Sequence, residues 1–312
     1  MSGGIGVVMN PRAGGNARNP TAMARLGLLL GNIGEAHSTA NLEELYRVAE
    51  QFRRDGISVL GINGGDGTNH VVLTAFVRTY GDEPLPAIAF LRGGTMNTTA
   101  NACGVAHGSP RHLLSRLLDK LDGRMSLETV EYDTLEVNGE VGFMWGVGLT
   151  QNFLREYYDD GHGKPTPVTA VQTLVWGSIS GLVGNAKGQR LRARFRGKVT
   201  VDGQPWPDDF LAIAAGTIDQ IGLGFRPFRR VGERPRTFHA LGITCTVPEF
   251  LVDLGRIRLG LPMGPGKTHE ALARSLVLER DEPIDYFIDG DVYSSPSPVT
   301  VGVGPRLRII TS

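Results

Sequence analysis

The chain has 312 residues, of which 41% are apolar and 21% are charged, a composition that excludes a disordered or fibrous protein. At about 150 residues per domain, this length predicts roughly two domains. The 32 basic residues balance the 32 acidic ones, so no overall field draws the chain to nucleic acid, and we expect no nucleic-acid partner.

The two cysteines, Cys103 and Cys245, are too few for a disulfide framework or a zinc cluster and fit a reducing compartment. The N-terminus has no basic segment followed by a long apolar one, and no run reaches about 18 apolar residues. We therefore expect a cytoplasmic protein without a membrane-spanning helix.

Short apolar runs alternate with helical patterns through the first third of the chain. The patterns of buried strands occur at residues 5–9, 35–37, 58–62 and 87–91. The patterns of helices occur at residues 20–30, 42–54, 68–78 and 111–121. Strands that alternate with helices predict a parallel sheet covered by helices, which we assign to a Rossmann-like α/β domain at residues 1–130.

The pattern changes after about residue 130. Alternating segments separated by Gly and Pro occur at residues 134–137, 190–201, 210–214 and 238–247. They predict an antiparallel β-sandwich domain at residues 131–312, from which the last strand could return to the first domain. The apolar segment 168–183, which contains Trp176, suits either a helix or a strand, and we expect residues 156–167 to form a mobile loop.

A glycine-rich loop joins the strand at 58–62 to the helix that follows it. Residues 63–70 read NGGDGTNH, and the glycines let backbone N–H groups approach a ligand at a helix N-terminus, where an anion is favoured. Asp66 would repel a phosphate unless a cation lies between them or its carboxylate accepts from a ribose or backbone donor. A magnesium nucleotide meets both demands.

A second loop of the same kind follows the strand at 87–91 and reads Gly93-Gly94-Thr95-Met96-Asn97. Either loop alone is as well explained as a tight turn between a strand and a helix. Two such loops at the carboxyl ends of parallel strands would flank one crevice, which favours a nucleotide site.

Four motifs in a fixed order carry a resemblance to a known family. They are Asn10-Pro11 with Gly14-Gly15, Gly64-Gly65-Asp66-Gly67-Thr68, Gly94-Thr95-Met96-Asn97, and Asp289-Gly290-Asp291. Together they resemble the diacylglycerol kinase catalytic-domain superfamily, which includes bacterial lipid kinases, sphingosine kinases and ceramide kinases, with NAD kinases as distant relatives. The GGDGT motif is highly specific, whereas the other three are weak when taken alone.

The resemblance implies that ATP and Mg²⁺ bind in a cleft between an α/β domain and a β-sandwich domain that holds the lipid. It implies that Asp66 makes a polar contact with the nucleotide or the metal. The other residues that it assigns to the nucleotide and its phosphates are Asn10, Thr39, Gly65, Gly67, Thr68, Gly94, Thr95 and Asn97.

The segment 285–292, DYFIDGDV, places Asp289 at a corner between a strand and a turn, with Asp291 nearby. A carboxylate at such a corner usually serves only the turn. The resemblance implies instead that Asp289 is the general base, and we expect Asp291 to be a metal ligand although a Glu is common at its position.

Two departures from the family pattern concern metal binding. Thr98 stands where many of these lipid kinases have an Asp. Sphingosine and ceramide kinases also often lack this Asp. Residues 232–241, GERPRTFHAL, replace an acidic turn that holds a structural Mg²⁺ in some bacterial diacylglycerol kinases, so we expect no second metal. By resemblance alone, Thr98 favours a sphingolipid acceptor.

Two further patterns have ordinary explanations. Residues 264–269, GPGKTH, resemble the end of a Walker A loop, but the upstream glycine is displaced by one position, so we interpret them as a turn. Five cations at period two would share one face of a strand: Arg190, Arg192, Arg194, Arg196 and Lys198. A solvated sheet face explains them, and docking to an anionic membrane is the alternative.

We therefore predict an ATP- and Mg²⁺-dependent lipid kinase, peripherally bound to the inner membrane surface, that phosphorylates a hydroxyl of ceramide, a sphingoid base or diacylglycerol. A kinase of a soluble substrate, such as an NAD kinase, is a first alternative, because it shares the GGDGT motif. A relative that binds nucleotide or lipid without turnover is a second, suggested by Thr98.

Overall fold

The computed structural model describes residues 4–123, 127–149, 193–222 and 224–311. The chain divides into two compact units: unit 1 comprises Met1–Tyr132 with Pro305–Ser312, and unit 2 comprises Asp133–Gly304. The division lies two residues beyond the boundary expected at residue 130, and the last strand is part of unit 1. The segments 156–167 and 168–183, with Trp176, lie outside the described residues.

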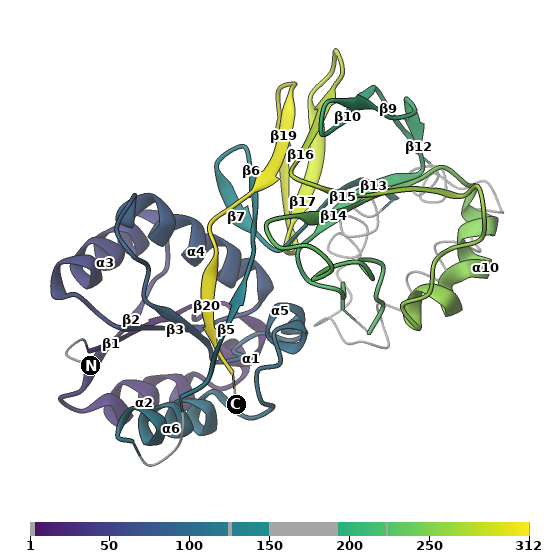
Figure 1. The fold of residues 1–312 in the computed structure, drawn as a ribbon. Helices are drawn as coiled ribbons and strands as arrows, with labels where there is room; N and C mark the ends of the chain where they lie inside the picture. The colour runs from purple at the N-terminus through teal and green to yellow at the C-terminus, as the bar shows by residue number, and fades with distance from the viewer. Residues whose placement is uncertain (1–3, 124–126, 150–192, 223, 312) are drawn as a thin grey trace. The chain divides into compact units, whose positions relative to one another are not determined.

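Unit 1 is a six-stranded sheet with helices on both faces (Figure 1). The strand order is β2-β1-β3-β4-β20-β5, in which every neighbouring pair is parallel except β20 with β5. The strands are β1 (Ile5–Met9), β2 (Gly34–Ser38), β3 (Val59–Asn63), β4 (Ala87–Phe90), β5 (Thr129–Tyr132) and β20 (Leu307–Ile310). The predicted parallel sheet is thus confirmed.

The helices of unit 1 form two layers. They are α1 (Gly14–Arg18), α2 (Pro20–Leu30), α3 (Leu42–Asp55), α4 (Asp66–Tyr80), α5 (Thr98–Ala102) and α6 (Pro110–Leu121). Helix α3 packs on α4 over one face of the sheet, and α2 packs on α6 over the other (Figure 1). Local signals fix their ends: the Asn41 side chain accepts from the Glu44 N–H at the start of α3, and Gly56 ends that helix at φ 61°.

Unit 2 is an antiparallel sandwich of two six-stranded sheets, ordered β11-β10-β16-β19-β6-β7 and β15-β14-β13-β8-β17-β18, with a separate pair β12-β9. Buried side chains from both sheets form one core, among them Val199 and Leu276 from the first sheet and Trp145 and Phe238 from the second. The predicted antiparallel architecture of the C-terminal part is therefore confirmed.

The elements of unit 2 are mostly short strands. They are β6 (Leu135–Val137), β7 (Glu140–Gly142), β8 (Met144–Gly148), β9 (Phe195–Arg196), β10 (Lys198–Val201), β11 (Gln204–Pro205), β12 (Asp209–Phe210), β13 (Ala212–Gly216), β14 (Phe238–Ile243), α10 (Val247–Arg258), β15 (Thr268–Ala273), β16 (Ser275–Glu279), β17 (Ile284–Ile288), β18 (Asp291–Ser295) and β19 (Val299–Val303).

The expectation of one continuous basic strand at residues 190–201 is wrong for the described part of it. The chain breaks at Gly197 into β9 and β10, which belong to different sheets, and Arg190 and Arg192 lie outside the described residues. Arg194 does not face solvent with the others, because its guanidinium donates to the Asp209 carboxylate and to the Thr244 and Cys245 carbonyls. The period-two pattern missed these acceptors, which come from distant segments.

None of the helices in the described residues combines the length and the apolar composition needed to cross a membrane.

Candidate functional site

The residues predicted to bind the nucleotide gather at one edge of the sheet in unit 1. Met9, the last residue of β1, is in register with Ser38 of β2 and with Asn63 of β3. Asn10, Thr39 and the GGDGT loop therefore leave the sheet side by side. The chain runs from β1 to β2 on one side and to β3 on the other, and ligands of open α/β sheets bind at such a switch point.

Asn10 connects the first loop to the GGDGT loop. Its Nδ2 donates to the Thr68 Oγ1 at 2.8 Å, its Oδ1 accepts from the Arg12 N–H at 2.9 Å, and its own N–H donates to the Asn63 carbonyl at 3.0 Å. The Thr39 N–H donates to the Met9 carbonyl, which holds Thr39 at the same edge.

Asn16 is a residue of this edge that the sequence did not reveal. Its buried Nδ2 donates to the carbonyls of Asn10 and Asn63, at 2.8 and 3.0 Å, and its N–H donates to the Gly93 carbonyl at 3.2 Å. It thus ties all three loops together. No local signal marks it, because an asparagine in a five-residue helix is unremarkable without the partners.

The glycines of the three loops are required by space rather than by a positive φ. A side chain on Gly94 would collide with the Gly65 backbone, one on Gly64 with the Thr68 side chain, and one on Gly14 with the Thr95 hydroxyl. The loops after β1, β3 and β4 therefore lie in direct contact with one another.

The N-terminus of α4 supplies the donors that an anion needs. The first bond of this helix runs from the Asn69 N–H to the Gly65 carbonyl at 2.9 Å, so the N–H groups of Asp66, Gly67 and Thr68 have no acceptor within the helix. These groups and the helix dipole favour a phosphate at this end of α4.

Asp66, which lies in the GGDGT loop, binds the backbone that follows the loop after β4. Its Oδ2 accepts from the Thr98 N–H at 3.0 Å and its Oδ1 from the Thr99 N–H at 2.8 Å, which caps the N-terminus of α5. Burial raises the pKa of the Asp66 carboxyl, while these hydrogen bonds oppose the rise. Each oxygen has a lone pair beyond these bonds, so the contact with nucleotide or metal stays a prediction.

The second loop is shaped by two residues in the left-handed region. Asn97, at φ 50°, accepts from the Gly94 N–H and donates to the Gly94 carbonyl, at 3.1 and 3.2 Å. Arg92, at φ 56°, donates to the Asn101 side chain and the Val105 carbonyl, both at 2.6 Å. Asn97 therefore sets the turn around Thr95, and its role toward the nucleotide remains a prediction.

Asp289 belongs to unit 2, in the two-residue turn that joins β17 to β18. Asp289 and Gly290 have φ values of 47° and 106°, and positive φ at both positions is what a type I′ hairpin turn requires. The carboxylate is 1% exposed; its Oδ1 accepts from the Met144 N–H at 2.8 Å and its Oδ2 from the Phe143 N–H at 2.9 Å. These bonds fix its orientation.

Asp291 opens β18, in register with Ile288, and is half-buried. Burial raises the pKa of the nearby Tyr293, and Asp291, Glu140, Tyr286 and Asp289 raise it further, in that order. In the part of the chain that the structure describes, no group of three or more His, Cys, Asp or Glu side chains could hold a metal ion.

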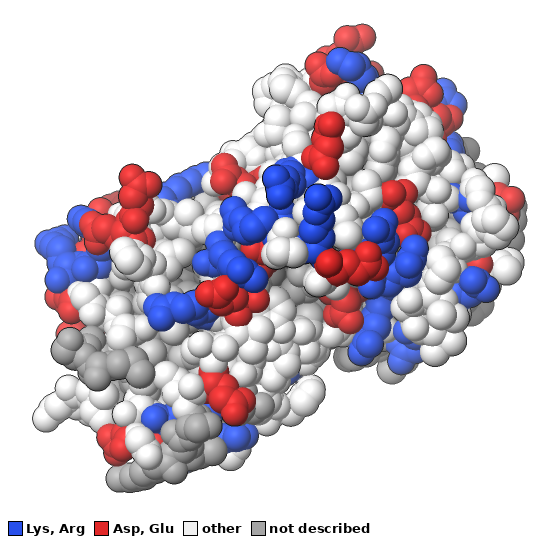
Figure 2. All heavy atoms as spheres, in the orientation of Figure 1, with Lys and Arg blue, Asp and Glu red and all other residues white. Residues whose placement is uncertain are grey.

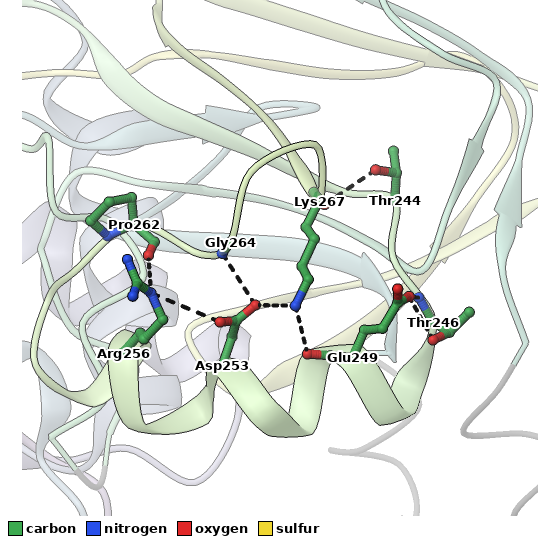
Figure 3. Close-up of polar contacts among 8 residues, drawn as sticks. All are labelled: Thr244, Thr246, Glu249, Asp253, Arg256, Pro262, Gly264 and Lys267. Carbon is green, nitrogen blue, oxygen red and sulfur yellow. Dashed lines mark hydrogen bonds and ion pairs between the residues drawn. The ribbon is translucent and has the colours of Figure 1, made fainter.

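The GPGKTH segment forms a turn that is fastened to α10, in unit 2. Figure 3 shows the Lys267 side chain extending from this turn toward the helix, where its ammonium donates to the Asp253 carboxylate at 2.7 Å and to the Glu249 carbonyl at 3.3 Å. The Asp253 carboxylate also accepts from the Gly264 N–H at 3.2 Å. Lys267 thus serves the turn, as we expected for this segment.

Comparison with known proteins finds a family model that matches part of the chain and solved structures with a similar fold. Residues 4–130 match the family model described as the diacylglycerol kinase catalytic domain. Comparison with the curated proteins finds no match.

Three solved structures from Bacillus anthracis strain Sterne are similar over 99% of this chain and 97% of theirs. One is of a candidate diacylglycerol kinase, with 19% identity and a TM-score of 0.72. The others are of a diacylglycerol kinase, at 16% and 0.66, and of a candidate diacylglycerol kinase, at 18% and 0.69. At these identities the likeness shows a shared fold.

Proposed function

Because residues 4–130 match the family model of the diacylglycerol kinase catalytic domain, we propose that the chain is an ATP-dependent lipid kinase that transfers the γ-phosphoryl group to a hydroxyl of a membrane lipid. The observation that carries the proposal is the meeting of three glycine-containing loops at one sheet edge, beside the N-terminus of α4. Ceramide, a sphingoid base and diacylglycerol are the acceptors to be compared.

In this proposal unit 1 binds the triphosphate. The N–H groups of Asp66, Gly67 and Thr68 donate to phosphate oxygens, and the Thr68 hydroxyl, which accepts from Asn10, keeps its own proton to donate. Gly65, Gly94 and Thr95 line the approach, with Thr39 and Asn97 at its sides. Such donors stabilise the charge that spreads over the transferred group in the loose transition state.

Mg²⁺ would arrive with ATP as part of the substrate, since Mg²⁺ is usually held by phosphates, waters and one or two carboxylates. Among the described residues we assign Asp291 as a carboxylate ligand, because it is half-buried and lies one turn residue from Asp289. When bound, the ion offsets the phosphate charge.

Asp289 would accept the proton of the lipid hydroxyl. A loose transition state requires this transfer only late in the reaction, so a carboxylate suffices. The N–H groups of Phe143 and Met144 hold the carboxylate in one orientation.

The acceptor is tested with labelled ATP offered in parallel with ceramide, sphingosine, diacylglycerol and NAD. A phosphorylated lipid supports the proposal, and the relative kcat/KM values name the acceptor. A labelled NAD product alone would assign a kinase of a soluble substrate. No product under any divalent metal, together with measurable ATP binding, would assign a relative without turnover, which Thr98 at the position of a common Asp favours.

The role of Asp289 is tested by Asp289→Asn, which we expect to lower kcat at least about a hundredfold. Asp285→Asn, at an exposed position of the same strand, is the matched control and should keep normal turnover. Circular dichroism and thermal unfolding establish that both variants fold. Near-normal turnover of a folded Asp289→Asn enzyme would remove Asp289 from the role of base.

A further inference from the structure

Exposed apolar side chains concentrate at the C-terminal end of α10 and the loop beside it. The described residues include nine large apolar side chains that are exposed, and four of them lie here: Ile221, Val252, Leu259 and Leu261, at 39%, 78%, 74% and 47% exposure. Single exposed apolar residues are normal on a soluble protein, but a cluster marks an interaction surface.

Backbone hydrogen bonds hold the segments of this cluster beside one another. The Arg226 N–H donates to the Ile257 carbonyl at 3.0 Å, the Ile221 N–H to the Phe225 carbonyl at 3.0 Å, and the Leu261 N–H to the Arg256 carbonyl at 2.9 Å.

The solvent-exposed face of α10 carries two large apolar residues. Val252, Gly255, Arg256 and Leu259 follow the spacing of one helix face, and all four are exposed. The opposite face carries the buried Ile257. A helix that only packed on the sandwich would carry polar residues on its outer face, so Val252 and Leu259 are unexplained by folding.

Arginines frame the apolar residues. Arg226 and Arg256 have side chains that are 56% and 49% exposed, and the Arg258 guanidinium lies 5.8 Å from the centre of the Phe225 ring. Arg226 lies 3.6 Å from the Asp219 carboxylate, and Arg256 lies 3.8 Å from the Asp253 carboxylate, which Lys267 also contacts (Figure 3). The charged residues on α10 and the segments bonded to it are four cations, Arg226, Arg256, Arg258 and Lys267, and three acids, Asp219, Glu249 and Asp253. The local charge is therefore positive.

We propose that this α10 patch, formed by Ile221, Val252, Leu259 and Leu261 with Arg226, Arg256 and Arg258, docks the protein on an anionic lipid bilayer. The apolar side chains enter the headgroup region, and the guanidiniums contact lipid phosphates and carboxylates. The inference deepens the proposed function and rests on it, since an enzyme that phosphorylates a bilayer lipid has to work at the bilayer surface.

Binding is measured by co-sedimentation of the full chain, without ATP, with vesicles of phosphatidylcholine containing about one third phosphatidylserine. We expect Val252→Asp with Leu259→Asp to lower the partition coefficient at least about tenfold, because two apolar side chains leave the interface. Arg226→Gln and Arg256→Gln should each lower it about fivefold. Added salt and pure phosphatidylcholine vesicles should weaken binding of the wild-type chain.

Matched controls lie in unit 1. Leu28→Asp replaces a leucine that is 82% exposed on α2, and Arg47→Glu reverses an exposed charge on α3, and both should leave vesicle binding unchanged. The docking proposal would be refuted if these controls lowered vesicle binding as much as the patch variants do. It would also be refuted if Val252→Asp with Leu259→Asp bound vesicles like the wild-type chain. A dimer in light scattering that the double variant abolishes, with no vesicle binding, would assign the patch to a second copy of the chain and also overturn it.

Kinase activity toward a short-chain, water-soluble diacylglycerol separates this inference from the proposed function. Normal turnover of that acceptor with no vesicle binding would refute the docking surface and leave the kinase proposal standing. Patch-dependent vesicle binding without turnover of any acceptor would refute the kinase proposal alone.

Discussion

Two carboxylates that the sequence assigns to chemistry are also held by backbone N–H groups. Asp66 accepts from Thr98 and Thr99, and Asp289 accepts from Phe143 and Met144. Hydrogen bonds to a charged group are among the stronger ones in proteins, and they fix a carboxylate in one orientation. At both positions these bonds therefore fix the carboxylate and shape the backbone around it.

Replacing Asp66 should loosen the second loop. In Asp66→Asn one carboxylate oxygen becomes an NH₂ group that faces an N–H donor of α5, so we expect unit 1 to lose about 1–3 kcal/mol of unfolding free energy. The KM for ATP should rise, since α5 and the loop before it shift. Denaturant unfolding and steady-state kinetics measure the two effects. Asp55→Asn, at the exposed end of α3, is the control and should unfold like the wild-type chain. If Asp66→Asn is as stable as this control, Asp66 does not cap α5.

A methyl group at position 94 tests whether loop contact matters for the nucleotide. In Gly94→Ala the new Cβ meets the Gly65 backbone, which cannot rotate away, so the loops separate and the KM for ATP should rise at least about tenfold. Gly255→Ala is the control, because a Cβ there meets open space inside α10 and should stabilise the helix by about 0.5–1 kcal/mol. Unchanged ATP kinetics in Gly94→Ala would refute the close approach.

At the scale of elements, the four strands and four helices predicted within residues 5–121 lie within about two residues of their observed bounds, whereas α1, α5 and β5 were not predicted. Helix α3 has its apolar face, its Asn41 cap and its terminal Gly56 within one short segment, so local patterns suffice. Contacts between distant segments cannot be predicted in this way. The Asn16 side chain donates to a carbonyl 47 positions away, and the Arg194 guanidinium donates to one 50 positions away.

The turn that resembles a Walker A loop should stabilise α10 through the ion pair between Lys267 and Asp253, and this contribution should depend on pH. The hydrogen bond from Lys267 is the main cause that lowers the pKa of Asp253 below its usual value. A lowered pKa in the folded state contributes stability above the unfolded pKa, about 3.9, and this contribution is lost as the pH falls below it.

Asp253→Asn should therefore lower the midpoint of thermal unfolding at pH 7 by about 4 °C, and the difference from the wild-type chain should shrink below about pH 4. A pH series of thermal melts measures it. Asp281→Asn, at an exposed position between β16 and β17, should show no such difference. A gap between Asp253→Asn and wild type that is constant from pH 3 to 7 would show that the ion pair is not its cause.

On the scale of the whole molecule, the chain consists of two units with separate cores. Ile5, Leu26 and Leu114 belong to the core of unit 1, whereas Trp145 and Phe238 belong to that of unit 2. Basic and acidic side chains are mixed over much of the face drawn in Figure 2, in keeping with the balanced total charge. A ligand that binds one unit can thus stabilise it without changing the other.

ATP with Mg²⁺ should protect unit 1 in particular. At a hundred times its Kd, a ligand adds about 2.7 kcal/mol to the stability of the unit that binds it, provided that the unfolded chain does not bind it. Hydrogen exchange should therefore slow in residues 63–69 and 93–99, where the three loops meet, and in α4 and α5 behind them. Amides in the core of unit 2, such as those of β14, report whether the effect is confined to one unit. Gly94→Ala should abolish the protection, and slowing in β14 without slowing in α4 would place the nucleotide on the other unit.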